Sequence, residues 1–320
     1  MSVLAKDAAG HLPGLEETSE AERAEARSGG RSRTFLLAMA LGIIGIFGIL
    51  PLFLALIYSF LVADTYGGVR WEFSTAAYVQ LLFDQDIFDD TLTFNPAYVQ
   101  IFWRSILLAT YSTVASLLIG FPTAYFMATR PAHQRDFWIF LITIPFWTNL
   151  LIRTFAMQLI VRDEGVVNIS LMGLGVISQP LEIIYTDFAV ALGLLYAFLP
   201  FMVLPIYAAL ERLDFRLVEA GFDLYANRFK VLRRIIIPLA MPGIIAGSIL
   251  VFIPGLGAYI TPELLGGGKH LMIGNMIAIQ FGSSRNWPFG FAAALVLMSL
   301  VMIALTVYAR NSRQLGGGHG

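Results

Sequence analysis

The sequence predicts an all-α protein that crosses a membrane several times. Of its 320 residues, 57% are hydrophobic and 13% are charged, whereas soluble domains carry about 25% charged residues. The apolar residues gather in long runs that contain few charges. Runs of about 20 such residues are long enough to cross a bilayer as a helix. Composition and run length therefore favour a polytopic membrane protein with six transmembrane helices.

Six segments are predicted to span the membrane. The first follows Arg31 and Arg33, and its apolar run is too long for a signal peptide, so we interpret it as an uncleaved span. The third is expected to continue without interruption through Pro145 and Asn149. The predicted spans cover residues 35–62, 105–129, 137–160, 188–210, 239–259 and 289–309.

The remaining segments are predicted as tails and connections. Residues 1–34 are rich in glutamate, alanine, serine and glycine, which is typical of a solvated, flexible tail, and 311–320 form a short glycine-rich tail. Residues 64–100 form a long polar connection with clustered aspartates. Residues 271–281 are moderately apolar but carry Asn275 and Gln280, which favours a re-entrant or interfacial helix rather than a span.

The basic residues predict which side of the membrane each connection occupies. Lysine and arginine are enriched in cytoplasmic loops. One side of the six-span topology holds Arg31, Arg33, Arg130, Arg135, Arg212, Arg216, Arg228, Lys230, Arg233, Arg234, Arg310 and Arg313. The other side holds Arg70, Arg162, Lys269 and Arg285, with Arg104 and Arg153 near that end of their helices. We therefore expect both termini and residues 211–238 in the cytoplasm.

Several classes of function are disfavoured. The chain has no cysteine, and its four histidines are scattered without metal-ligand spacing, so we expect no metal site. A net charge of −1 gives nucleic-acid binding no electrostatic support. The run Gly266–His270 fails the phosphate-loop pattern because Lys269 is followed by histidine. We expect no catalytic residues, and the chain is predicted not to be an enzyme.

The cytoplasmic connection carries the clearest motif. Glu219-Ala220-Gly221 is followed by three residues, Tyr225, nine residues, Ile235, one residue, and Ile237-Pro238. This spacing resembles the EAA loop of bacterial ABC importer permeases, in which Glu-Ala-Ala, glycine and Ile-x-Leu-Pro stand at these places. The sequence departs from that pattern at Gly221, Ile237 and, most clearly, Tyr225, which replaces the glycine.

The residues of this loop predict two helices. Residues 219–224 are expected to form a short helix in which the small residues Ala220 and Gly221 allow close approach of a partner. Asn227 tolerates a left-handed cap and is expected to supply the break. A second helix over 228–237 is expected to stop at Pro238. The alternative interpretation is an ordinary basic loop that only sets membrane topology.

Other segments narrow the resemblance. The stretches 144–153, 199–207, 237–247, 266–275 and 286–290 resemble the corresponding segments of spermidine/putrescine-type permeases, collinearly over about 35–310. The resemblance is to the first permease of the pair, with a type I ABC importer permease fold. It implies an inner-membrane subunit that forms half of a polyamine pathway with a second permease. A periplasmic substrate-binding protein and an ATPase dimer that binds ATP and Mg²⁺ are the other implied partners, and no cofactor is expected in this chain.

The resemblance assigns coupling to the ATPase to residues in the loop, namely Glu219, Ala220, Gly221, Asp223 and Leu224. A polycation that crosses a low-dielectric region needs carboxylates, carbonyls or aromatic faces. The candidates for this pathway are Glu263, Trp147, Asn149, Tyr259, Asn275 and Trp287. Trp and Tyr also serve as simple interfacial anchors. The alternative functions are import of another small amine, amino acid or opine, and self-sufficient secondary transport.

Overall fold

The computed structural model describes the backbone of residues 37–85 and 92–316, with side chains described for 37–84 and 92–306. The chain divides into two compact units, residues 1–57 and 58–320. The helix Leu37–Tyr58 makes up the described part of the first unit and ends on the first residue of the second. It contains a π-helical turn, Gly45–Ile49, followed by α2, Leu50–Tyr58. The predicted tail 1–34 lies outside the described residues.

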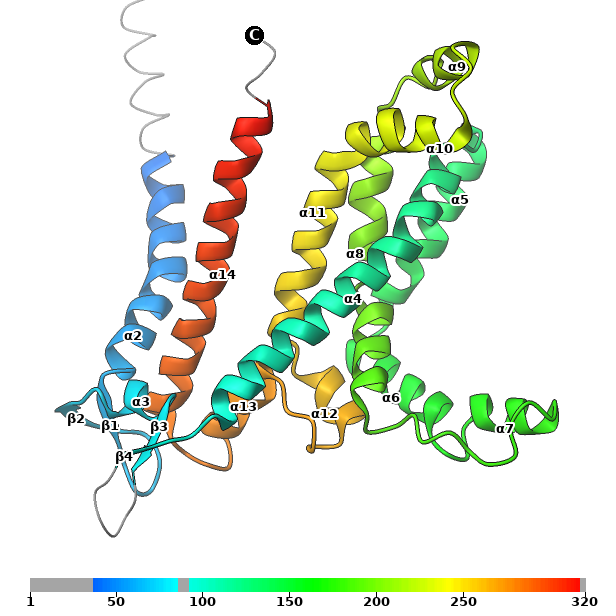
Figure 1. Cartoon of the computed structure of the whole chain (residues 1–320). Helices are drawn as coiled ribbons and strands as arrows, with labels where there is room; N and C mark the ends of the chain where they lie inside the picture. The colour runs from blue at the N-terminus through cyan, green and yellow to red at the C-terminus, as the bar shows by residue number, and fades with distance from the viewer. Residues whose placement is uncertain (1–36, 86–91, 317–320) are drawn as a thin grey trace, which may run out of the picture. The chain divides into compact units, whose positions relative to one another are not determined.

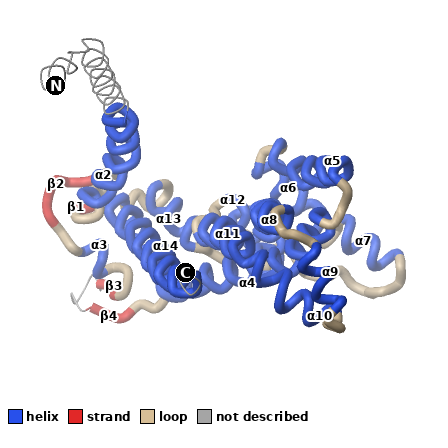
Figure 2. The backbone as a smooth tube through the Cα atoms, turned by 90° about the horizontal axis from the view of Figure 1, so that it is seen from above, coloured by secondary structure: helices blue, strands red, loops and turns tan. Residues whose placement is uncertain are grey.

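Three long helices form the centre of the second unit (Figure 1). They are α4, Ala97–Ala128; α8, Asp187–Glu211; and α11, Ile237–Leu256. Figure 2, which looks down on the unit, shows α8 and α11 close together beside α4. The largest core cluster lies where these helices meet and includes Met127, Met202 and Ile206, all fully buried. We call this group the central bundle.

Small residues set the spacing between α8 and α11. A Cβ atom added to Gly243 would lie 2.5 Å from the Pro205 carbonyl oxygen and 2.7 Å from the Ala209 Cβ. A Cβ on Gly247 would lie 2.9 Å from the Met202 sulfur. Membrane helices associate through such small residues because close packing replaces the hydrophobic driving force that water supplies elsewhere.

The third predicted span is not one straight helix, which corrects the sequence prediction. Residues Ala132–Trp147 and Leu150–Gly173 meet at an angle of 93°. The first part is α5, Ala132–Thr143, with a 3₁₀ turn at Ile144–Trp147, and the second begins with α6, Leu150–Val161, and α7, Val166–Gly173. Thr148 and Asn149 are extended, and the Asn149 side chain accepts a hydrogen bond from the Leu151 N–H at 2.8 Å. Asn149 therefore starts a new helix at the point where we expected continuity.

The long connection after the first span contains strands, so the chain is mostly rather than entirely helical. Strands β1, Leu61–Ala63, and β2, Val69–Phe73, pair in antiparallel fashion. After a short helix, α3, Ala76–Val79, strands β3, Phe83–Gln85, and β4, Leu92–Phe94, form a second pair. Most of the aspartate cluster lies outside the described residues.

The C-terminal third completes the unit with α12, Ile260–Gly266; α13, Ile273–Phe281; and α14, Trp287–Gly316. Nine residues are too few for α13 to cross a bilayer, which agrees with the predicted re-entrant or interfacial helix. Because α14 continues to Gly316, the predicted tail at 311–320 begins inside a helix. Within the described ranges, five helices could each span a membrane, and the bent pair raises the count to six.

Candidate functional site

Two sites lie at opposite ends of the central bundle. The coupling loop, residues 211–238, joins α8 to α11 at one end, and α12 and α13 lie at the other (Figure 1). The loop contains α9, Arg216–Asp223, and α10, Arg228–Val231. We refer to its position as the loop end of the bundle and to the position of α12 and α13 as the opposite end.

Tyr225, rather than Asn227, makes the break between the two loop helices. Tyr225 has a left-handed φ of 57°. Its N–H donates to the Phe222 carbonyl at 2.9 Å, and the Ala226 N–H donates to the Gly221 carbonyl at 3.1 Å. These two bonds form a Schellman motif, in which glycine is the usual left-handed residue. The prediction for Asn227 was wrong, because Asn227 is extended and caps α10 by accepting from the Lys230 N–H at 2.8 Å.

Pro238 does not end the second loop helix, which corrects the other prediction for this segment. Helical structure runs from Arg228 to Leu256 without a break. A π-helical turn, Leu232–Ile236, comes just before Pro238. Pro238 has no N–H to donate, but it lies at the second position of α11, which begins directly after this turn, and the helix continues through it. The second loop helix and α11 therefore form one continuous helix.

Apolar contacts attach the loop to the bundle. Val218, Val231 and Ile236 are buried in the central core cluster. A Cβ on Gly221 would lie 2.8 Å from the Ile235 Cδ1. The close approach that Gly221 permits is therefore between α9 and the helix that follows it. At the same end, the Tyr207 hydroxyl donates to Glu211 at 2.9 Å, and Arg135 lies 3.8 Å from the same carboxylate.

The outer face of the loop combines exposed apolar side chains with exposed charges. Leu224 is 81% exposed and Tyr225 is 97% exposed. Other exposed residues of this face are Leu217, Glu219, Ala220, Phe222, Asp223 and Phe229. Clustered apolar side chains on a surface, bordered by polar ones, are typical of a site that contacts another protein. Four of the five predicted coupling residues, all except Gly221, lie on this exposed surface.

The opposite end brings three of the predicted pathway residues together. The Asn275 side chain is 1% exposed. Its Nδ2 donates to Glu263 Oε2 at 2.8 Å and to the Tyr259 carbonyl at 3.1 Å. Glu263 lies on α12 and Asn275 on α13, so this pair ties the two short helices together. We call Tyr259, Glu263 and Asn275 the acidic cluster. The Glu263 carboxylate is exposed while one of its oxygens is held in place.

The other three predicted pathway residues make different contacts. Asn149 caps α6. The Trp147 ring meets the Phe140 ring at 5.7 Å and is 76% exposed. Trp287 is the first residue of α14 and is 38% exposed. Within the described residues, the hydrogen bonds of the acidic cluster involve none of these three side chains.

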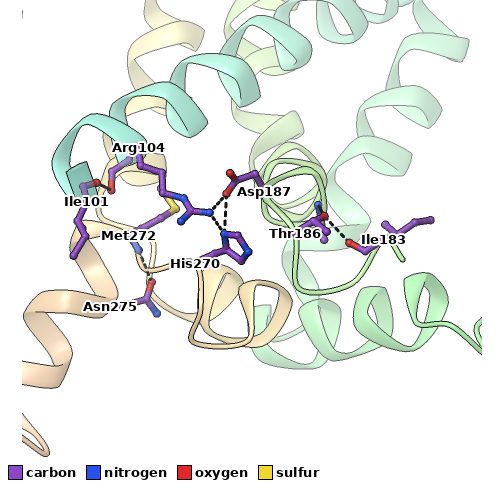
Figure 3. A network of polar contacts seen from close by, with 10 residues as sticks. Ile101, Arg104, Ile183, Thr186, Asp187, His270, Met272 and Asn275 are labelled. Carbon is purple, nitrogen blue, oxygen red and sulfur yellow. Dashed lines mark hydrogen bonds and ion pairs between the residues drawn. The ribbon is translucent and has the colours of Figure 1, made fainter. Parts of the chain in front are cut away.

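A charged group near the acidic cluster was not predicted as a group. Figure 3 shows Arg104 of α4, Asp187 at the start of α8 and His270 of the loop after α12 turned toward one another. Arg104 donates to Asp187 and contacts the His270 ring, and His270 Nδ1 lies 3.6 Å from the Asp187 carboxylate. The sequence placed Arg104 at the edge of a span, but the sequence alone does not indicate which distant residues it meets. This charged group fastens three segments at the opposite end.

The candidate spans are those of an integral membrane protein. Residues 29–315 match the family described as binding-protein-dependent transport system inner membrane component, and the chain belongs to this family. It is a multi-pass protein of the inner membrane.

Named relatives agree with this family. The chain is 40% identical over 269 residues to the spermidine/putrescine transport system permease protein PotB of Haemophilus influenzae, covering 84% of this chain and 90% of that protein. It is 39% identical over 280 residues to PotB of Escherichia coli strain K12, covering 88% and 98%. A crystal structure of a bacterial ABC transporter that imports alginate has a chain with a TM-score of 0.62 and 17% identity, covering 89% of this chain and 99% of that one. This last likeness concerns the fold alone.

Proposed function

We propose that this chain is the first permease of a pair in an ATP-driven importer of polyamines resembling spermidine and putrescine. It forms half of the substrate pathway with a second permease. A periplasmic binding protein delivers the substrate, and an ATPase dimer binds ATP and Mg²⁺. The similarity to PotB over most of both chains supports the substrate class.

The exposed face of the coupling loop is the observation that carries the coupling part of this proposal. Glu219, Asp223 and Leu224 are accessible to a protein that approaches the loop end. Since one helix runs from Arg228 to Leu256, a displacement of the loop moves α11 with it. ATP binding by the partner then biases two arrangements of the permease pair, which is the general requirement for a nucleotide-driven switch.

The acidic cluster supplies the chemistry for a cationic substrate. The exposed carboxylate of Glu263 attracts a protonated amine, and Asn275 fixes its orientation with a 2.8 Å hydrogen bond. The Tyr259 ring, 47% exposed, adds an aromatic face of the kind that binds alkylammonium groups. In this arrangement the loop end and both chain termini lie in the cytoplasm, and the opposite end faces the periplasm.

The coupling claim is tested in an importer assembled with its second permease, ATPase and binding protein in proteoliposomes. Glu219→Ala should lower spermidine uptake and substrate-stimulated ATP hydrolysis about tenfold, the effect of losing about 1.4 kcal/mol at an interface. Glu182→Ala is the matched control, because Glu182 is also exposed and lies outside the loop. Normal uptake by the assembled Glu219→Ala importer would contradict the coupling role. Uptake that proceeds without the ATPase would identify a secondary transporter instead.

The substrate claim is tested with the same preparation. Spermidine and putrescine should compete for uptake, whereas an amino acid, an opine and a monoamine should not. Glu263→Gln should raise the KM for the polyamine severalfold. The control Glu182→Gln should keep the wild-type KM. If Glu263→Gln transports with an unaltered KM, the acidic cluster does not contact the substrate.

A further inference from the structure

The β1–β2 ribbon, residues 61–73, has one aromatic face. Trp71 and Phe73 lie two residues apart on β2, in and beside a bulge that interrupts the pairing of this strand, and we call their exposed rings the aromatic face. Trp71 is 76% exposed and Phe73 is 79% exposed. Arg70 and Glu72 lie within 4.0 Å of each other. Two large aromatic side chains are thus exposed on a ribbon that also carries an exposed charged pair.

Ring contacts place this face beside the ends of two candidate spans. The Trp71 ring lies 6.3 Å from the ring of Tyr58, the last residue of the helix Leu37–Tyr58. The Tyr58 ring also meets Phe291, near the start of α14, at 5.4 Å. The candidate span Trp287–Thr306 of the same unit has 20 residues, so its length of about 30 Å matches the hydrocarbon thickness of about 30 Å. Trp71 therefore lies at the level where hydrocarbon gives way to headgroups.

The ribbon is held firmly in this orientation. The Phe60 and Phe73 rings stack at 5.7 Å, and Phe60 also contacts Tyr78 at 5.0 Å. At the turn, Arg285 donates to the Tyr66 carbonyl at 3.4 Å, and its side chain packs over Gly67. Contacts at both ends of the ribbon thus prevent the aromatic face from turning inward.

We propose that the aromatic face of the β1–β2 ribbon lies in the headgroup region of the bilayer and anchors the opposite end of the permease there. Tryptophan favours this region because its ring is largely apolar while its indole N–H donates a hydrogen bond to water or a headgroup. The exposed pair Arg70 and Glu72 then faces water. Because the ring contacts place Trp71 level with the start of α14, we assign the face to lipid. This inference is independent of the transported substrate.

Depth-dependent fluorescence quenching tests the assignment. The full chain is placed in nanodiscs of phosphatidylethanolamine and phosphatidylglycerol that carry bromine either near the headgroup or near the chain ends. The signal of Trp71 is the difference between the wild type and Trp71→Phe. It should lose more intensity with bromine near the headgroup than with bromine near the chain ends, and aqueous iodide should quench it weakly. Strong quenching by iodide with none by either bromolipid would overturn the proposal.

A pair of double variants gives a second readout. Trp71→Ser with Phe73→Ser removes the aromatic face, and Arg70→Ser with Glu72→Ser removes the charged pair of the same strand. The aromatic variant should lose most of the gain in Tm that the wild type shows in nanodiscs over detergent, and the polar variant should keep it. Equal gains in both variants would show that lipid does not cover this face.

Discussion

The two ends of the central bundle differ in the polar contacts that accompany their apolar packing. At the loop end, buried apolar residues such as Val218, Val231 and Ile236 attach the loop to the bundle. The opposite end has its own apolar cluster, which includes Val190, Leu265 and Met272. It adds the hydrogen bonds and charges of the acidic cluster and the Arg104–Asp187–His270 group, which join separate segments. Apolar packing suits the role proposed for the loop, in which it moves as one body with α11. Polar bonds are directional and exchangeable with a charged ligand or water, which suits a part that must open to a polycation.

Disrupting the packing of α8 against α11, between the two ends, should have the largest effect on stability. Gly243→Leu would force side-chain atoms into the Pro205 backbone and Ala209, and should destabilise the protein by about 3 kcal/mol. Gly257→Leu is the control, since a Cβ at Gly257 meets no atom within 4 Å. Denaturant titration of both variants in lipid micelles provides the comparison. Equal stability of the two variants would show that α8 and α11 do not pack as described.

Disrupting the opposite end alone should have a smaller, local effect. Asn275→Leu leaves Glu263 and the Tyr259 carbonyl without their shared donor, which should cost about 2 kcal/mol. Limited proteolysis should then increase near α12 and α13 while the loop end keeps its wild-type protection. If the loop end becomes equally sensitive, the two ends are not separately stabilised.

The smallest effects should come from the break inside the coupling loop, and they should have opposite signs. Tyr225→Gly removes the strain of a left-handed tyrosine and should stabilise the protein by about 1 kcal/mol. Asn227→Ala removes the cap of α10 and should destabilise by about 1 kcal/mol. Thermal unfolding of the two variants measures both. Destabilisation by Tyr225→Gly would mean that the exposed ring contributes to folding as well as to the surface.

Hydropathy was sufficient to indicate all of the candidate spans except the third, because a long apolar helix depends on local composition. The short helix at 273–281 followed from its length and its polar residues. Pairings between distant residues were not predictable in this way. The contact of Arg104 with Asp187 depends on the angle at which α4 and α8 cross. The sequence pattern carries no information about this crossing angle. The 93° bend was missed because Asn149 was considered as a polar residue inside a span rather than as a helix cap.

In the coupling loop too, the sequence predicted the helices but not a detail of their geometry. The two helices followed from the spacing of the motif, but the position of the left-handed residue did not. Asparagine is the more common choice for that conformation, yet the hydrogen bonds of the Schellman motif fix it at Tyr225. Tyr225 therefore adopts the left-handed geometry that glycine usually takes in this motif, and it adds an exposed ring to the outer face of the loop.

Site-specific cross-linking from the coupling loop tests the central claim most directly. Because the chain has no cysteine, Leu224→Cys gives a single attachment point for a photoreactive label on a residue that is 81% exposed. Leu174→Cys, on a residue 77% exposed after α7, is the matched control. In the assembled importer, the label at position 224 should capture the ATPase subunit and the label at position 174 should not. Equal capture from both positions, or none from position 224 in an importer that transports, would contradict the account.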